Sequence, residues 1–120
     1  MATQTAEEQL AAVGAELAHP WAESEERTVE TGAFAITVRK RGNRYDLDDG
    51  GEAIARARAL GGPTDWLPIA EDVVAAQGFN VNRRGVVFVP VVEGRDLASI
   101  SVKLAECAES VHAALLDAAS

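Results

Sequence analysis

The chain has 120 residues, 48% of them hydrophobic, and its 19 acidic side chains outnumber 11 basic ones for a formal net charge of −8. This length is typical of one domain, here residues 1–120, and the apolar fraction excludes a wholly disordered chain. A single cysteine, Cys107, excludes a disulfide framework and a zinc site built on thiolates.

The predicted elements begin with a helix over residues 6–18, whose apolar side chains recur at three- and four-residue intervals. An acidic linker follows at residues 23–26, and we expect it to be exposed. Residues 1–30 are therefore predicted to form a helix and a partly flexible linker, ahead of a core over residues 31–118.

Alternating apolar and polar residues then predict strands over residues 26–31 and 33–41. A Gly42-Asn43 dipeptide is typical of a two-residue hairpin turn, because both residues tolerate positive φ angles. A third strand is predicted over residues 44–47.

The second half of the chain alternates helices with a second hairpin. The predicted elements are helices over 51–60 and 65–77, strands over 79–81 and 86–92, and a long helix over 95–118. The resulting order, α-β-β-β-α-α-β-β-α, favours an α+β fold with two layers, in which helices pack on an antiparallel sheet of about five strands.

Four acidic residues gather at the corner between the third strand and the next helix: Asp46, Asp48, Asp49 and Glu52. Asp49 with Glu52 three positions later fits a capping box, which predicts a helix cap. A calcium loop is not matched, because Gly50 stands where an acidic ligand is needed. A Mg²⁺ site at Asp46 and Asp48, serving an enzyme, is the alternative; we predict no metal and no cofactor.

Other catalytic patterns are missing from the sequence. His19 and His112 fit no catalytic triad, and Cys107 falls on an apolar helical stripe, as a buried structural thiol does. No glycine-rich phosphate loop is present. The sequence thus predicts a protein without catalytic residues, that is, not an enzyme.

A cluster of basic residues lies within this acidic chain, so nucleic-acid binding is an alternative function. The two helices over 51–60 and 65–77, followed by a two-stranded wing, have the order of a winged helix. The second helix carries three acids and no base, which disfavours contact with phosphates. A winged-helix-like regulator would depend on basic residues in two turns: Arg39, Lys40, Arg41, Arg83 and Arg84.

The last helix carries the longest apolar stripe in the sequence. Packing on the sheet of the same chain is one interpretation, and a two-fold homodimer through this helix is the other. The residues predicted for that dimer interface are Leu97, Ile100, Leu104, Val111 and Leu115.

Binding of another protein remains as the predicted activity. Aromatic and apolar anchors dominate protein interfaces, and the basic cluster could dock an acidic segment. The residues predicted to contact a partner are Trp66, Phe88, Val91, Arg39, Arg41 and Arg44. No apolar run approaches the roughly 20 residues of a membrane span, and the polar N-terminus is unlike a secretory signal, so we expect no membrane partner and a cytoplasmic location.

The segment Tyr45-Asp46-Leu47-Asp48-Asp49-Gly50-Gly51-Glu52, between a strand and a short helix, resembles a bacterial and phage domain family with a Tyr-x-Leu-Thr-Asp-x-Gly-Glu corner. Here Asp48 replaces the threonine, and Gly51 is inserted. The resemblance spans about residues 30–118 and implies a fold and an accessory role without an assigned activity. The element order is also similar to small acidic secretion chaperones, which implies a homodimer that binds extended client segments.

Overall fold

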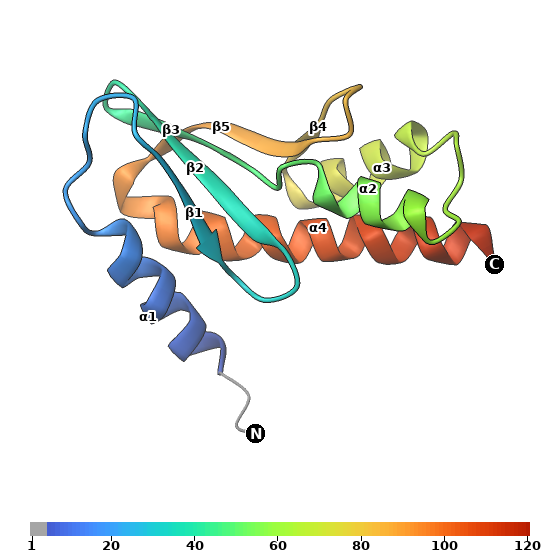
Figure 1. Ribbon diagram of the computed structural model, residues 1–120, viewed down its shortest axis with the longest axis horizontal. Helices are drawn as coiled ribbons and strands as arrows, with labels where there is room; N and C mark the ends of the chain where they lie inside the picture. Colours follow the sequence, from blue (N-terminus) through green and yellow to red (C-terminus); the bar gives the residue numbers. More distant parts are fainter. Residues whose placement is uncertain (1–4) are drawn as a thin grey trace.

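The strands of this chain form one antiparallel sheet, and the helices pack on it (Figure 1). The computed structural model describes residues 5–120, and residues 1–4 of the predicted domain lie outside that range. In chain order the elements are α1 (Ala6–Leu17), β1 (Glu26–Glu30), β2 (Ala35–Arg41), β3 (Arg44–Asp48), α2 (Glu52–Ala59), α3 (Leu67–Gln77), β4 (Asn80–Val81), β5 (Val87–Glu93), a 3-10 turn (Gly94–Asp96) and α4 (Leu97–Ala119). The predicted order and the two-layer α+β class are confirmed.

The order of strands across the sheet is β1-β2-β3-β5-β4, so the pairing of β3 with β5 joins parts of the sheet that are far apart in the sequence. β1, β2 and β3 follow one another as a meander, whereas β5 returns beside β3 after α2, α3 and β4. β4 has two residues and pairs with Val87 and Phe88 of β5. The rest of β5 has no strand on that side among residues 5–120.

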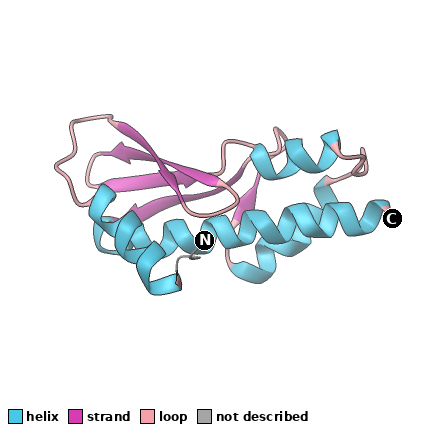
Figure 2. Ribbon diagram, turned by 60° about the horizontal axis from the view of Figure 1, so that its bottom comes forward, coloured by secondary structure: helices cyan, strands magenta, loops and turns pink. Residues whose placement is uncertain are grey.

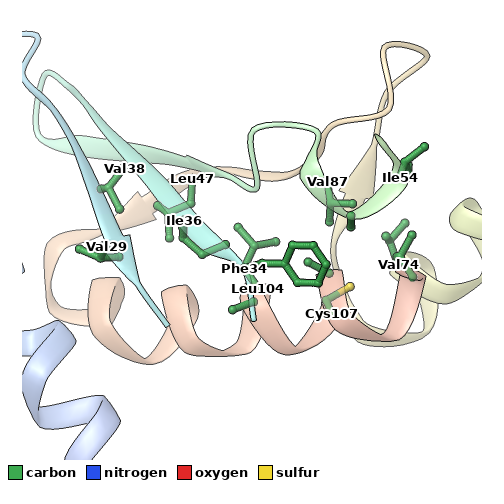
Figure 3. Packing of buried hydrophobic residues seen from close by; sticks show 14 of the residues in the cluster. Val29, Phe34, Ile36, Val38, Leu47, Ile54, Val74, Val87, Leu104 and Cys107 are labelled. Carbon is green, nitrogen blue, oxygen red and sulfur yellow. The ribbon is translucent and has the colours of Figure 1, made fainter. Parts of the chain in front are cut away.

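Alternation along the strands directs one set of side chains toward the helices, where they form the core (Figure 3). Val29, Ile36, Val38 and Leu47 are buried on this face of the sheet. α4 lies across it and also contacts α1, α2 and α3, as Figure 2 shows. Neither α4 nor any other helix in the described part of the chain is long and apolar enough to cross a membrane.

The apolar stripe of α4 is part of this core, which corrects one prediction. Leu97, Leu104, Val111 and Leu115 are buried within the single chain, so they have almost no surface left to lose in a dimer. Their assignment to a homodimer interface is therefore wrong. Ile100 is half-buried and lies at the edge of the stripe.

Arg27 of β1 and Trp21, which lies between α1 and β1, hold the C-terminal end of α1 on the sheet. The guanidinium of Arg27 donates hydrogen bonds to the carbonyl oxygens of Glu16 at 3.1 Å and His19 at 3.0 Å, and it lies 4.0 Å from the centre of the Trp21 ring. The Trp21 indole N–H donates to the Leu17 carbonyl at 2.9 Å. The linker at 23–26 is exposed as predicted, apart from a half-buried Glu25.

Candidate functional site

The face of the sheet that points away from α4 carries two rows of opposite charge. Because Ile36 and Val38 point into the core, Arg39 and Arg41 of β2 point to the other side. On β3, Asp46 and Asp48 flank the buried Leu47 and share that side, and Asp46 is the register partner of Arg39. We call this surface the open sheet face.

Ion pairs neutralise the arginines that the sequence marks as a basic cluster. Arg39 donates two hydrogen bonds, at 2.5 and 3.0 Å, to Glu26, and this contact raises the pKa of the guanidinium. Arg41 lies 2.5 Å from Asp46. Arg44, the first residue of β3, lies 3.7 Å from Glu93 of β5. The open sheet face is therefore a surface of alternating charge rather than a positive patch.

A hollow of about 340 Å³ lies on the open sheet face. The charged side chains of Arg39, Arg41 and Asp46 line one part of it, and Phe88 and Pro90 of β5 line another. Phe88 is half-buried and pairs in register with Asp48. An apolar ring thus lies beside two rows of charged side chains. This arrangement fits contact with a protein partner better than binding of a small polar ligand.

β5 is distorted directly beside this hollow. The pairing of β3 with β5 shifts register between Tyr45 and Leu47, and the carboxylate of Asp46 accepts a hydrogen bond of 3.2 Å from the backbone N–H of Val91. Val91 has a φ of +60° and is 67% exposed. A β-branched residue in the left-handed region is a strained exception, and such exceptions gather at functional sites.

The structure brings three of the predicted contact residues together and leaves the others apart. Arg39, Arg41 and Phe88 line the same hollow, whereas Val91 lines a second hollow that shares Pro90 with it. Arg44 lies beyond the hollow, beside Glu93. The placement of Trp66 is different: its ring is half-buried and faces Gly85, where an added Cβ would meet it at 3.6 Å. Trp66 therefore packs against the core and lies outside the hollow of the open sheet face, and its contact with a partner stays a prediction.

Asp49 binds the start of α2 through its carboxylate, but the N-cap position is Gly51, so the predicted capping box does not form. Its carboxylate accepts hydrogen bonds from the backbone N–H groups of Gly51 at 2.8 Å, Ala53 at 3.1 Å and Val87 at 3.0 Å. Glu52 does not complete the box, because its carboxylate lies 3.2 Å from Nε of Arg56. Asp49 is 1% exposed, and this burial raises the pKa of its carboxyl group despite the three donors.

The other acids of the corner have separate protein partners. Asp46 contacts Arg41 and Val91, and Asp48 accepts a hydrogen bond of 2.7 Å from the N–H of Gly50. Within residues 5–120, no group of three or more histidine, cysteine, aspartate or glutamate side chains could hold a metal ion together.

Sequence reasoning missed a larger and more apolar hollow of about 480 Å³ between α2, α4 and the turn that joins β1 to β2. Phe34 and Leu60 line it, together with Arg56, Glu109 and His112. Leu60 is 68% exposed although it ends the apolar stripe of α2. A leucine placed directly before Gly61-Gly62 is the sequence signal that could have indicated it.

Comparison of this chain with models of protein families, with curated proteins and with solved structures gives no match.

Proposed function

We propose that this chain is a non-enzymatic protein-binding module, of the adaptor or chaperone type, whose partner lies on the open sheet face. The observation that carries the proposal is the half-buried ring of Phe88 beside a hollow whose walls are rows of opposite charge.

The ion pairs of this face can be exchanged for contacts with a partner at low cost. The side chains of Arg39 and Glu26 are 44% and 50% exposed, and the side chain of Arg41 is 63% exposed. Exposed pairs of this kind contribute about 0–1 kcal/mol each. A partner segment with alternating acidic and basic side chains could therefore replace them while an apolar residue covers Phe88. This complementarity supplies specificity more than affinity.

Contacts with side chains fit this surface better than addition of a strand to the edge of β5. Pro90 has no N–H to donate, and the irregularity at Val91 twists the edge, which are two devices that suppress strand pairing. A partner lying across the face avoids both obstacles.

The pairing of charges also favours a protein over a nucleic acid. Arg39 and Arg41 lie beside the carboxylates of Glu26 and Asp46, so the open sheet face has no excess positive charge to attract a phosphate backbone. In α3, which would be the recognition helix of a winged helix, Glu71 and Asp72 are exposed. Both observations weaken binding to a phosphate backbone.

A photo-cross-linking residue in place of Thr37, which lies on the open sheet face beside Arg39, tests the proposal in cells that produce the chain. We expect an adduct with one defined protein, and we expect the yield to fall in an Arg41→Glu background. The matched controls are the same cross-linker at Gln77, exposed at the end of α3, and an Arg58→Glu background, which changes an exposed arginine on α2. Equal adducts from positions 37 and 77, or adducts of two copies of this chain alone, would contradict the proposal.

A further inference from the structure

The hollow between α2 and α4, which we call the α2–α4 hollow, is apolar and has a preformed shape. The guanidinium of Arg56 lies 4.6 Å from the centre of the Phe34 ring and donates a hydrogen bond of 2.9 Å to the Ala33 carbonyl. The His112 ring meets the same Phe34 ring edge-on, with centroids 5.7 Å apart. These contacts fix Phe34 as the floor of the hollow before any partner arrives.

An exposed apolar side chain lies at the rim of this hollow. Leu60 is 68% exposed, and within residues 5–120 it is the most exposed of the large hydrophobic side chains. Ala59, which is exposed beside it, supplies further apolar surface. A leucine beside an apolar hollow is a projection next to a recess, and two copies related by a two-fold axis would place each projection in the recess of the other.

The charges on the two walls have the same self-complementary arrangement. Arg56 comes from α2 and Glu109 from α4, so the walls carry opposite signs. In a two-fold pair, Arg56 of one copy would approach Glu109 of the other. Among the described residues Glu109 forms no ion pair, so its carboxylate is available for that contact.

We propose that the α2–α4 hollow is a homodimer interface, in which Leu60 of each copy occupies the hollow of its mate and Arg56 pairs with Glu109 across the two-fold axis. The interface uses the outer flank of α4, at Glu109 and His112, and not the buried stripe of that helix. It involves no residue that lines the hollow of the open sheet face, so it does not depend on the function proposed above.

Solution mass from light scattering across a concentration series tests the proposal first. We expect twice the mass of the chain for the wild type and an increase of at least about tenfold in the dimer dissociation constant for Leu60→Ser, because each leucine loses its burial. The matched control is Leu10→Ser, which changes a 40% exposed leucine on α1, outside the hollow, and should dimerise as the wild type does. A wild type that remains monomeric at several hundred micromolar overturns the proposal, as does a dimer that Leu60→Ser leaves intact.

Mixing two charge variants tests the pairing across the axis. Glu109→Arg alone and Arg56→Glu alone would each place like charges together in a homodimer, whereas an equimolar mixture restores both opposite-charge pairs in a heterodimer. We expect native mass spectrometry to show the heterodimer in clear excess over either homodimer. A statistical mixture of the three dimers would overturn the pairing. Because Arg56 also contacts Phe34, circular dichroism of each variant must first match the wild type, and the Leu60→Ser result stands without these variants.

Discussion

Asp49 and Val87 are joined by two hydrogen bonds although 38 positions separate them. The backbone N–H of Asp49 donates to the Val87 carbonyl at 3.0 Å, and the backbone N–H of Val87 donates to the Asp49 carboxylate at 3.0 Å. The same carboxylate accepts hydrogen bonds from the N–H groups of Gly51, directly before α2, and of Ala53 in its first turn. One acidic side chain thus joins the end of β3, the start of α2 and the start of β5.

Replacement of Asp49 by asparagine should destabilise the fold. Asparagine has one acceptor oxygen, so either the N–H of Ala53 or the pair from Gly51 and Val87 would face an amide N–H₂ group. An unsatisfied buried donor costs about 1–3 kcal/mol, and we expect the free energy of unfolding in urea to fall by about that amount. Asp48→Asn is the control. The half-exposed Asp48 accepts a hydrogen bond from the N–H of Gly50 at the surface, so this variant should lose under 1 kcal/mol of stability. Equal losses in the two variants would contradict the role assigned to Asp49.

The pH dependence of stability should carry the signature of the same group. Burial raises the pKa of Asp49 in the folded chain above its unfolded value of about 3.9. The contribution of Asp49 to the free energy of unfolding is therefore full below that unfolded value and declines as pH rises through the higher folded value. The difference in free energy of unfolding between wild type and Asp49→Asn should shrink over that interval in chemical denaturation at several pH values. A difference that grows with pH would reverse the sign and refute the argument.

Glycine at position 91 should stabilise the chain. Val91 adopts a left-handed backbone at φ +60°, which costs a residue with a Cβ roughly 1–2 kcal/mol, and little apolar burial is lost because the side chain is 67% exposed. Glycine also has more conformational freedom in the unfolded chain, which offsets part of this gain. We therefore expect the free energy of unfolding to rise by up to about 1 kcal/mol. Thr28→Gly, at an exposed position in the regular strand β1, should lower it. If both substitutions destabilise equally, Val91 is not strained.

The thiol of Cys107 should be unreactive in the folded protein. The side chain is fully buried, and this burial raises its pKa to about 11. Reaction requires the exposed thiolate, so a thiol reagent at pH 8 should modify Cys107 after denaturation and not in the native state. Rapid modification of the native chain, at the rate of a small-molecule thiol, would show that α4 opens or that Cys107 is misplaced.

Hydrogen exchange should reveal how α1 is held. The planar guanidinium of Arg27 donates to three carbonyl groups near the C-terminal end of that helix, those of Glu16, His19 and Pro20, and lies over the Trp21 ring. The ammonium group of a lysine lacks this planar, forked geometry. We expect Arg27→Lys to accelerate amide exchange in α1 while the rates in α4 stay as in the wild type. Uniform acceleration in both helices would instead indicate global destabilisation.

Local patterns predicted the elements, and long-range packing decided what the sequence could not predict. The Gly42-Asn43 turn and the period of each helix depend on near neighbours, so their prediction succeeded. The turn differs in one detail, since Gly42 has a positive φ and Asn43 does not. Whether the stripe of α4 faces its own sheet or a second copy depends on how much of the core the other helices fill, and no local pattern contains that information.

In the candidate surfaces too, local patterns could be predicted and long-range contacts could not. The arginines were visible in the sequence as a cluster, but their carboxylate partners come from other strands, as Glu26 does for Arg39. The exposure of Leu60 and the approach of Phe34 to α4 depend on the turn after β1, whose position follows from the whole sheet. Leu60 follows the helical spacing of the buried Ile54 and Ala57, yet the three-dimensional arrangement leaves it at the surface.

The adjacency of β3 and β5 has a consequence for the route by which the chain folds. The meander of β1, β2 and β3 requires short turns and can form early, whereas β5 must find β3 across a loop that contains two helices. Contacts between distant positions slow folding, because the entropy of loop closure is lost before the contacts form. The slow event in folding should thus be closure of this loop. Substitutions at Asp49 should alter the folding rate, whereas substitutions in α1 should alter mainly the unfolding rate.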